Sequence, residues 1–341
     1  MKIIVDGMGG DNAPAAVVEG AVLASRAIPH HIALIGKEEL LAAELKKHSY
    51  EAEKISIIDA TEVISNEEAP VRAVRSKKDS SIVKGINMVK NGEGDIFVSA
   101  GSTGALLAGG LFILGRIPGI DRPALASVYP IIGGRASLLV DAGANSDCKP
   151  NNLLEFGIMG NIYMEKVLGR KNPTVGLVNI GAEASKGSTL TKAAYSLLEQ
   201  SDMNFIGNVE GRDVPAGACD VIVTDGFSGN VLLKLTEGMA LQMMKTLKAR
   251  FTAGVKAKLG AALLLDKIRE MKQEFDYSEY GGAPILGVRG PIVKMHGSSN
   301  ANAVKNTIIK AVPYAEEKVV DIIQNSVLEI EEITLSENDK F

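Results

Sequence analysis

Residues 221–233 read Val-Ile-Val-Thr-Asp-Gly-Phe-Ser-Gly-Asn-Val-Leu-Leu, and this stretch decides how the chain folds. A short β-branched run ends at Asp225, glycines and small polar residues follow, and a helical pattern then begins. This order predicts a buried parallel strand, a tight turn and the N-terminus of a helix. Such a turn presents backbone N–H groups and the positive end of a helix dipole, so it can bind an anion.

Turns of the same character follow other predicted strands along the chain. With residues 225–230, they are the segments 6–12, 99–104, 141–145, 179–187 and 296–300. Ligands of open α/β sheets bind beyond the carboxyl ends of the strands, and parallel strands would bring all these turns to one edge. We therefore expect one polar rim suited to a small anion or a phosphoryl group, with the side chains of Asp6, Asp11, Ser102, Thr103, Asn145, Lys186, Ser228, Asn230, His296 and Asn300.

Strand and helix patterns alternate from end to end, which predicts a three-layer α/β/α fold with a mainly parallel sheet. Neither a repeat nor a break in composition divides the chain, so we expect a single domain over residues 1–341 with a protruding helical element at about 245–280. The long helix after Asn230 carries Leu235, Met239 and Met243 at a spacing of four, a pattern typical of core packing. Two helices, 301–310 and 315–329, are expected to close the fold.

Composition excludes several classes of function. The net charge of −4 and the aromatic content of 4% argue against a nucleic-acid-binding protein. Two cysteines, Cys148 and Cys219, are too few for a disulfide framework or a metal cluster and indicate a reducing, cytoplasmic setting. No signal peptide is expected at Met1, and the nearly uncharged stretch 100–115 is too short to span a membrane, so it predicts a buried helix.

Familiar cofactor and hydrolase motifs are missing from the sequence. Residues 7–10, Gly-Met-Gly-Gly, lack the third glycine of a dinucleotide fingerprint, and Lys186-Gly187-Ser188 reverses the order of a phosphate-binding loop. Ser228 lies outside a Gly-x-Ser-x-Gly motif, and no His or Cys spacing indicates a metal site. We therefore expect no cofactor and no metal.

Several of these residues have an equally good structural explanation. Asp6, Asp141 and Asp225 can each cap the turn that follows them. Lys186 can pair with Glu183, three residues earlier, instead of binding phosphate. The sequence leaves both alternatives open.

Taken together, the motifs resemble those of the PlsX family, bacterial acyltransferases that transfer an acyl group from acyl-carrier protein to phosphate. The matching segments span residues 6 to 300 and are 6–11 (Asp-Gly-Met-Gly-Gly-Asp), 99–105, 143–145 (Gly-Ala-Asn), 186–187 (Lys-Gly), 207–211 (Gly-Asn-Val-Glu-Gly), 224–230 and 294–300. Two positions depart from the family pattern. Ser102 stands where Asn is usual, and Ala182 where an acidic residue is usual, so position 182 is given no role while Glu183 remains.

The resemblance implies a reversible reaction in which inorganic phosphate attacks the thioester of acyl-[acyl-carrier-protein] and yields acyl phosphate. This reaction initiates phosphatidic acid synthesis, and a downstream glycerol-3-phosphate acyltransferase uses the product. The resemblance further implies a homodimer, a fold similar to isopropylmalate dehydrogenase and phosphotransacetylase, and a cytoplasmic protein peripherally associated with the inner face of the cell membrane.

Roles for individual residues follow from placing this chemistry on the turns. Phosphate is already an anionic nucleophile, so the enzyme has to position it and stabilise a tetrahedral oxyanion. Lys186 is a candidate for phosphate binding, and His296 or Lys186 for proton donation to the thiolate. Asn230 is a candidate for holding the thioester oxygen, while Asp225 contacts reactants or shapes the turn. The expected phosphate-binding residues are Asp6, Gly7, Gly9, Gly10, Asp11, Ser102, Thr103, Gly104, Asn145 and Ser228.

The segment Lys245–Lys272 has the composition of a basic amphipathic helix. It holds eight basic and two acidic residues, a charge of +6 within a chain of net −4. Such a helix binds a membrane surface, and its charge also attracts an acidic carrier protein. The expected contact residues are Val255, Lys256, Lys258, Leu259, Leu263 and Leu264. The alternative is a helix that packs in a dimer and exposes a solvated basic face.

Two other functions remain as rivals. A nicotinamide-linked hydroxyacid dehydrogenase of related fold would need clusters of metal-binding carboxylates, and the sequence shows no convincing set. A non-catalytic, membrane-associated scaffold would need only the basic helix.

Overall fold

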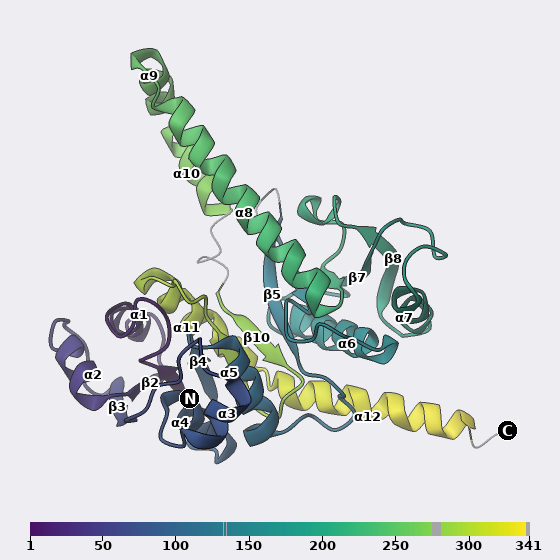
Figure 1. The fold of residues 1–341 in the computed structure, drawn as a ribbon, viewed down its shortest axis with the longest axis horizontal. Helices are drawn as coiled ribbons and strands as arrows, with labels where there is room; N and C mark the ends of the chain where they lie inside the picture. The colour runs from purple at the N-terminus through teal and green to yellow at the C-terminus, as the bar shows by residue number, and fades with distance from the viewer. Residues whose placement is uncertain (132, 134, 275–280, 339–341) are drawn as a thin grey trace.

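The fold is an eleven-stranded sheet with helices on both faces (Figure 1). The computed structural model describes residues 1–341 apart from 132, 134, 275–280 and 339–341. The strands are β1 (Lys2–Asp6), β2 (His31–Gly36), β3 (Ile55–Asp59), β4 (Ile96–Ser99), β5 (Ala124–Ile131), β6 (Arg135–Val140), β7 (Thr174–Asn179), β8 (Asn204–Glu210), β9 (Val221–Val223), β10 (Ala283–Leu286) and β11 (Ile292–Lys294).

Helices follow most of these strands in the order that the sequence predicts. They are α1 (Ala15–Ser25), α2 (Glu38–Leu45), α3 (Pro70–Ser76), α4 (Ser81–Lys90), α5 (Thr103–Gly109), which continues as a π-helix (Gly110–Leu114), α6 (Pro150–Lys166), α7 (Thr189–Glu199), a 3-10 turn (Val214–Ala216), α8 (Gly226–Phe251), α9 (Val255–Leu263), α10 (Leu265–Glu274), α11 (Ala301–Glu316) and α12 (Val319–Asn338). The three-layer α/β/α fold with a mostly parallel sheet is therefore confirmed.

The strands are buried on both faces, and alternate residues contribute to different cores. In β1, Ile3 and Val5 pack into the core beneath α1, α2, α6, α11 and α12, whereas Ile4 packs into the core beneath α3, α4 and α5. A third cluster lies under the base of α8 and includes Tyr129 and Ile222. Together these clusters make the middle layer a continuous buried sheet.

The sheet changes direction near its centre. Its order is β3-β2-β1-β4-β11-β10-β5-β6-β9-β7-β8. β1, β2, β3, β4 and β11 run parallel to one another, and β6, β7, β8 and β9 form a second parallel set. The antiparallel pairs β11–β10, β10–β5 and β5–β6 separate the two sets, which therefore run in opposite directions within the sheet.

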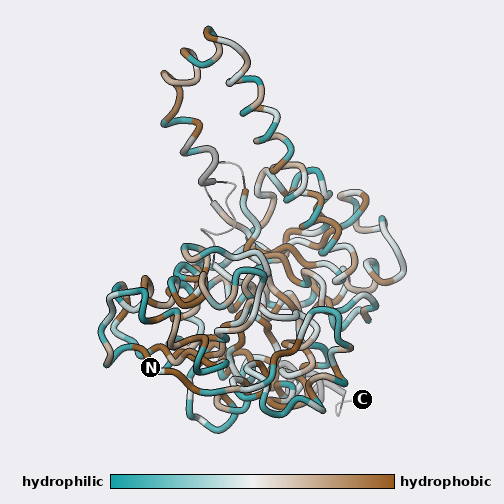
Figure 2. Tube along the Cα trace, turned by 60° about the vertical axis from the view of Figure 1, so that its left-hand side comes forward, coloured by the Kyte–Doolittle hydropathy of each residue, from teal (hydrophilic) through white to brown (hydrophobic). Residues whose placement is uncertain are grey.

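The helices over residues 245–274 project from the body of the fold. Figure 1 shows the distal half of α8 together with α9 and α10 extending away from the sheet, and Figure 2 shows apolar and hydrophilic residues alternating along this projection. The residues 275–280 of the expected element lie outside the described part of the chain. Among the described residues, no helix is both long enough and apolar enough to cross a membrane.

Two expectations about helices are wrong. Leu235, Met239 and Met243 of α8 are 62%, 65% and 50% exposed, so this stripe does not pack into the core of the chain. Secondly, α11 runs through Pro313 to Glu316 without the expected break. Pro313 has no N–H for the carbonyl oxygen of Ile309, so α11 loses one backbone hydrogen bond there, and the burial of its neighbours Val312 and Tyr314 keeps this last turn packed on the body of the protein.

Candidate active site

Three of the predicted turns meet beyond the ends of β1, β4 and β11. We call the segments 6–12, 99–104 and 294–300 the Asp6 cluster. The buried carboxylate of Asp6 accepts hydrogen bonds from the Ser99 hydroxyl at 2.6 Å and the Met8 N–H at 3.1 Å. The Asp11 N–H donates to the carbonyl oxygen of Gly297 at 2.8 Å. Burial raises the pKa of Asp6, and hydrogen bonds from Ser99, Ser81 and the backbone partly oppose that shift.

The glycines of the first turn are required by how closely these segments approach. A Cβ added to Gly9 would lie 2.5 Å from the Asp6 carboxylate and 2.6 Å from the Gly101 nitrogen. Gly10 has a φ of +97°, and an added Cβ would lie 2.9 Å from the Gly297 carbonyl oxygen. The glycine-rich pattern therefore allows the three turns to pack backbone against backbone.

Lys294 lies in the middle of the Asp6 cluster and is not among the site residues that the sequence predicts. Its Nζ donates hydrogen bonds to the carbonyl oxygens of Ala100, at 3.2 Å, and Met295. Burial lowers the pKa of Lys294 to about 8, although the nearby carboxylates of Asp6 and Asp11 act in the opposite direction. The only sequence signal for it is its position two residues before His296, in the last matching motif.

The N-terminus of α5 also borders this cluster. Ser102 is the N-cap residue, and its hydroxyl accepts from the Ala105 N–H at 3.4 Å. The hydroxyl of half-buried Thr103 has no hydrogen-bond partner among the described residues, and Gly104 packs against Pro70. The expected polar groups at 102–104 are therefore grouped at a helix N-terminus, where negative charge is favoured.

His296 is exposed, and the ring is oriented by the turn that follows it. Its Nδ1 lies 3.2 Å from the Ser298 N–H and 2.8 Å from the Ser298 hydroxyl. Because the backbone N–H can only donate, Nδ1 is the acceptor, and the neutral ring carries its proton on Nε2. His296 also lies near Glu237 of α8, whose pKa is raised by burial and lowered in part by His296.

A second group of turns follows β6 and β9. We call the segments 141–145 and 225–230 the Asp141 cluster. The buried Asp141 carboxylate accepts from the backbone N–H groups of Leu125, Gly143, Ala144 and Asn145 and from the Asn145 side chain, at 2.7 to 3.1 Å. This carboxylate therefore shapes its turn, as the capping interpretation predicts, and burial raises its pKa.

The stretch around Asp225 combines a cap with a free amide. Asp225 is the N-cap of α8 and accepts from the Ser228 N–H at 2.9 Å and the Ser228 hydroxyl at 2.8 Å. Asn145 is also engaged, since its amide donates to Pro123 and Asp141. Asn230, by contrast, has no hydrogen-bond partner for its side chain within the described residues, and its amide lies against Gly143.

One face of α8 connects the two clusters. Asn230 and Glu237 are seven residues apart, which places them on the same face about 10 Å from one another. Because Glu237 lies near His296, this face of α8 extends from the Asp141 cluster toward the Asp6 cluster. Lys234 lies between them and is close enough to lower the pKa of Glu237 in part.

Lys186 is separate from both clusters. It lies in the exposed loop between β7 and α7, where the Asn179 amide donates to its carbonyl oxygen at 3.2 Å. Its ammonium group contacts no partner among the described residues, so the possible ion pair with Glu183 is absent from this structure. The loop follows β7, which is hydrogen-bonded to β9, so Lys186 belongs to the Asp141 side of the molecule.

The expected single rim is therefore wrong in its topology. The turns after β1, β4 and β11 lie at one edge of the sheet, and those after β6, β7 and β9 follow strands that run the other way. The reason is the antiparallel insertion of β10 and the β5–β6 pair, which an alternating pattern does not reveal. Within the described residues, no three His, Cys, Asp or Glu side chains are grouped to hold a metal ion.

Comparison with known proteins gives a consistent result. The family model described as "Fatty acid synthesis protein" matches residues 1–322. The chain is 49% identical to the phosphate acyltransferase of Clostridioides difficile over 340 residues, covering 100% of both chains. It is 53% identical to the phosphate acyltransferase of Alkaliphilus oremlandii, covering 96% of this chain and 97% of that one.

Solved structures with a similar fold include acyl-transferring enzymes. A phosphotransacetylase from Streptococcus pyogenes superimposes with a TM-score of 0.62 and 19% identity, covering 93% of this chain and 94% of the other. The EutD phosphotransacetylase of Staphylococcus aureus gives a TM-score of 0.59 and 16% identity, covering 92% and 94%. At these identities the likeness establishes the fold, whereas the full-length relatives establish the family. The chain belongs to the PlsX family of phosphate acyltransferases.

Proposed function

We propose that this phosphate acyltransferase uses acyl-[acyl-carrier-protein] as acyl donor and releases acyl phosphate. A phosphate oxygen forms a bond to the thioester carbon, the carbon–sulfur bond breaks, and the carrier thiolate takes up a proton. The observation that carries this proposal is the Asp6 cluster, where a half-buried cation, Lys294, lies beside glycine turns and the N-terminus of α5. Such a site binds phosphate without a cofactor.

Phosphate binding is assigned to the Asp6 cluster. The residues that we propose for it are the backbone groups of Gly7, Gly9 and Gly10, the start of α5 at Ser102–Gly104, and the Lys294 ammonium group. The carboxylates of Asp6 and Asp11 balance the charge of Lys294 and hold it in place. Ser228 and Asn145 belong to the other cluster and their side chains already bond within their turns, so they are assigned to the turn structure and not to this phosphate.

Oxyanion stabilisation and proton transfer are assigned to groups along the α8 face. Asn230, whose amide has no partner among the described residues, and His296, which presents a donor at Nε2, belong to different clusters, so each can hydrogen-bond a different oxygen that becomes negative in the transition state. Lys294 is well matched to protonate the leaving thiolate, because its pKa of about 8 lies close to that of a thiol. Lys186 lies apart from both clusters and is retained as a charged contact to the acyl-carrier protein, and Asp225 as the cap that holds α8.

Assembly and location are proposed from exposed apolar and basic surfaces. The stripe Leu235, Met239 and Met243 of α8 supports a homodimer, since a large exposed apolar stripe on a soluble domain usually marks an interface. In α9, Val255, Leu259 and Leu263 are 76%, 64% and 88% exposed beside Lys256 and Lys258, which supports reversible binding to an anionic membrane or to the acidic carrier protein.

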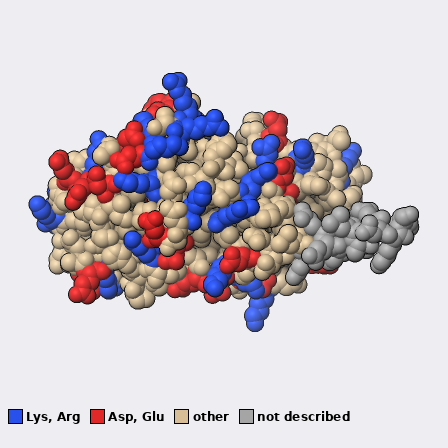
Figure 3. Space-filling model, turned by 90° about the horizontal axis from the view of Figure 1, so that it is seen from below, with Lys and Arg blue, Asp and Glu red and all other residues tan. Residues whose placement is uncertain are grey.

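The charge of the tip contrasts with the rest of the surface. Figure 3 shows Lys and Arg interspersed with Asp and Glu over the face opposite the tip. The concentrated positive charge of residues 245–272 therefore favours docking of an anionic membrane or of the acidic carrier protein at the tip. The product is then released near the membrane, where a glycerol-3-phosphate acyltransferase would use it.

The test is incubation of the purified protein with acyl-[acyl-carrier-protein] and inorganic phosphate. We expect phosphate-dependent release of the carrier thiol together with an acyl phosphate that hydroxylamine traps. Thiol release that is independent of phosphate, or no release at all, would contradict the proposal and favour a scaffold. Reduction of a nicotinamide by a hydroxy acid would favour the dehydrogenase rival. His296→Ala and Lys186→Ala should each lower the rate, and folded variants with wild-type rates would refute the site assignment.

A further inference from the structure

The short helix α3 presents a basic and partly apolar face to solvent. Its inner side carries the buried Ala73 and Val74, whereas Val71, Arg72 and Arg75 on the outer side are exposed. Neither arginine makes an ion pair within the described part of the chain. The two guanidinium groups are therefore available to carboxylates of another molecule.

Carboxylates of the same chain do not neutralise this face. Two of the three that flank the helix are already paired, in the ion pairs Glu68–Lys77 at 2.7 Å and Asp79–Lys84 at 2.6 Å. The third, Glu67, precedes the first residue of the helix. The outer side of α3 therefore keeps its positive charge.

A large aromatic side chain lies beside these arginines. The π-helix that continues α5 buries Leu114 but leaves Phe112 55% exposed. The guanidinium group of Arg75 lies over the Phe112 ring, 5.2 Å from the ring centroid. Aromatic and arginine side chains are enriched at protein interfaces, and π-helical turns are frequent at functional sites. We call Val71, Arg72, Arg75 and Phe112 the Arg75 patch.

The Arg75 patch lies next to the Asp6 cluster. Helices α3 and α5 start side by side, since a Cβ added to Gly104 would lie 2.6 Å from the ring of Pro70, the first residue of α3 (Figure 1). From this contact, Arg75 is about 8 Å along α3 and Phe112 about 12 Å along α5 and its π-helical continuation. The patch is therefore close to the turns at which we propose that phosphate binds, but it is not part of them.

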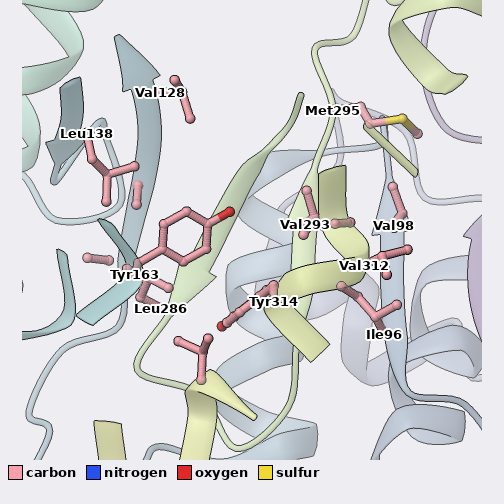
Figure 4. Packing of buried hydrophobic residues seen from close by; sticks show 14 of the residues in the cluster. Ile96, Val98, Val128, Leu138, Tyr163, Leu286, Val293, Met295, Val312 and Tyr314 are labelled. Atoms are coloured by element: carbon pink, nitrogen blue, oxygen red, sulfur yellow. The ribbon is translucent and has the colours of Figure 1, made fainter. Parts of the chain in front are cut away.

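The face of the sheet beneath α11 is filled next to this cluster. Val98 of β4, Val293 of β11 and the following Met295 are buried there. Figure 4 shows these side chains in one packed group with Val312 of α11. A large partner therefore has to approach the cluster from elsewhere, and α3 and α5 border it directly.

The tip of the helical projection is farther from the cluster than the Arg75 patch. Glu237 of α8 lies near His296, and Phe251 at the end of the helix is about 21 Å farther along it. A carrier docked on α9 would hold its thioester beyond that distance. The Arg75 patch offers the shorter path to the cluster.

We propose that the Arg75 patch is the surface on which the acidic acyl-carrier protein docks, while the prosthetic arm of the carrier extends to the Asp6 cluster. The inference rests on the proposed function, because it requires a carrier thioester as acyl donor. The unpaired arginines complement carboxylates of the carrier, and Phe112 supplies an apolar centre for the contact. A second copy of this chain fits less well, because a two-fold interface would bring two positive patches together.

The test variants change the charge and the apolar centre of the patch separately. The double variant Arg72→Glu, Arg75→Glu reverses the charge, and Phe112→Ala removes an exposed ring without opening the core. The matched control is Lys37→Glu, Lys46→Glu, two exposed positions that flank α2 on the other face of the sheet. Melting temperature is measured for each variant, so that a folding defect in one is recognised and the other carries the test.

Two measurements separate docking from chemistry. The Kd for fluorescently labelled acyl-[acyl-carrier-protein] is measured without phosphate, so that no turnover occurs. The second measurement is kcat/KM for the carrier thioester and for the same acyl group on free pantetheine, which lacks the carrier.

We expect the charge reversal to raise the Kd for the carrier by roughly tenfold or more and Phe112→Ala to raise it about fivefold. The value of kcat/KM for the pantetheine thioester should change less than about twofold, because that substrate does not touch the patch. Salt should weaken carrier binding more in the wild type than in the charge-reversed variant. The control should match the wild type in every measurement.

Carrier binding that is unchanged in the folded double variant would overturn this docking site. Equal losses with both thioesters would also overturn it, because they would show damage to the reaction site. A larger loss from Lys186→Glu would place the carrier on the Asp141 side, and lost flotation with phosphatidylglycerol vesicles alone would assign the patch to the membrane. If the wild-type protein binds the carrier at the patch but forms no acyl phosphate, the proposed function has failed and the docking site stands.

Discussion

The Nζ of Lys294 donates a hydrogen bond to the carbonyl oxygen of Ala100 at 3.2 Å, and this bond ties the end of β11 to the end of β4. The lysine is thereby held among the turns of residues 6–12, 99–104 and 294–300, beside Asp6 and Asp11. Burial disfavours its charged form, while the two carboxylates favour it. If phosphate binds here as proposed, it meets a cation that is already positioned before binding.

Lys294→Met should lower kcat/KM by about 10² to 10⁴-fold, the range for loss of a general acid. The wild-type rate should fall as pH rises through about 8, because the acid must be protonated and Lys294 loses its proton there. Lys294→Arg remains protonated, so that alkaline decline should disappear. The measurement is a pH profile of kcat/KM, with Lys192→Met on exposed α7 as control. A decline that persists unchanged in Lys294→Arg would exclude this lysine as the acid.

Gly9→Ala should disrupt the Asp6 cluster without unfolding the protein. The added methyl group would lie 2.5 Å from the Asp6 carboxylate and 2.6 Å from the Gly101 nitrogen, so the first two turns must separate. We expect a destabilisation of about 1–3 kcal/mol and at least a tenfold rise in KM for phosphate. Gly211→Ala is the matched control, because nothing lies within 4 Å of its added Cβ. Equal phosphate KM values in the two variants would show that the spacing of these turns does not matter.

The sequence predicts the local elements well because buried parallel strands and glycine turns have strong local signals. The stretch after Val221 forms the strand, turn and helix that its residues indicate, with Asp225 as N-cap of a helix that starts at Gly226. It does not predict the antiparallel pairing of β10, which depends on neighbours far away in sequence, β5 and β11. The error about a single rim follows from that one strand and the β5–β6 pair.

The site is predictable only where function is carried by a short motif. Asp6, Ser102, Asn230 and His296 each stand in a recognisable turn. Lys294 also stands in the matching segment 294–300, but its sequence position does not reveal its burial or its charge environment, which come from segments around residues 6, 11 and 100. The stripe Leu235, Met239 and Met243 of α8 shows another limit of the sequence. A spacing of four identifies an apolar helix face, but it does not show whether residues of the same chain bury that face.

Exposed residues of α8 should form the dimer interface. Leu235 and Met239 lie one turn apart and are both more than 60% exposed, at 62% and 65%. The double variant Leu235→Glu, Met239→Glu would place two charges in that interface and should convert the dimer to a monomer with an unchanged far-ultraviolet circular dichroism spectrum. Light scattering coupled to gel filtration gives the mass. Lys248→Glu, at an exposed position on the opposite face of the same helix, should leave the dimer intact. A dimeric double variant would place the interface elsewhere.

The apolar face of α9 should insert into anionic membranes. Val255, Leu259 and Leu263 are spaced by four residues, and none of them is buried; the side chain of Leu263 is 88% exposed. The double variant Leu259→Glu, Leu263→Glu removes two large apolar side chains from the lipid contact and adds two negative charges. The amount of protein that floats with phosphatidylglycerol vesicles should therefore fall at least tenfold. Ala262→Glu changes the charge at an exposed neighbour of this face and should retain most binding.

Raising the salt concentration should weaken wild-type flotation, because salt screens the attraction between the lysines beside this face and the anionic lipids. If the double variant floats like the wild type but binds acyl-[acyl-carrier-protein] more weakly, the tip is a docking site for the carrier and not for the membrane.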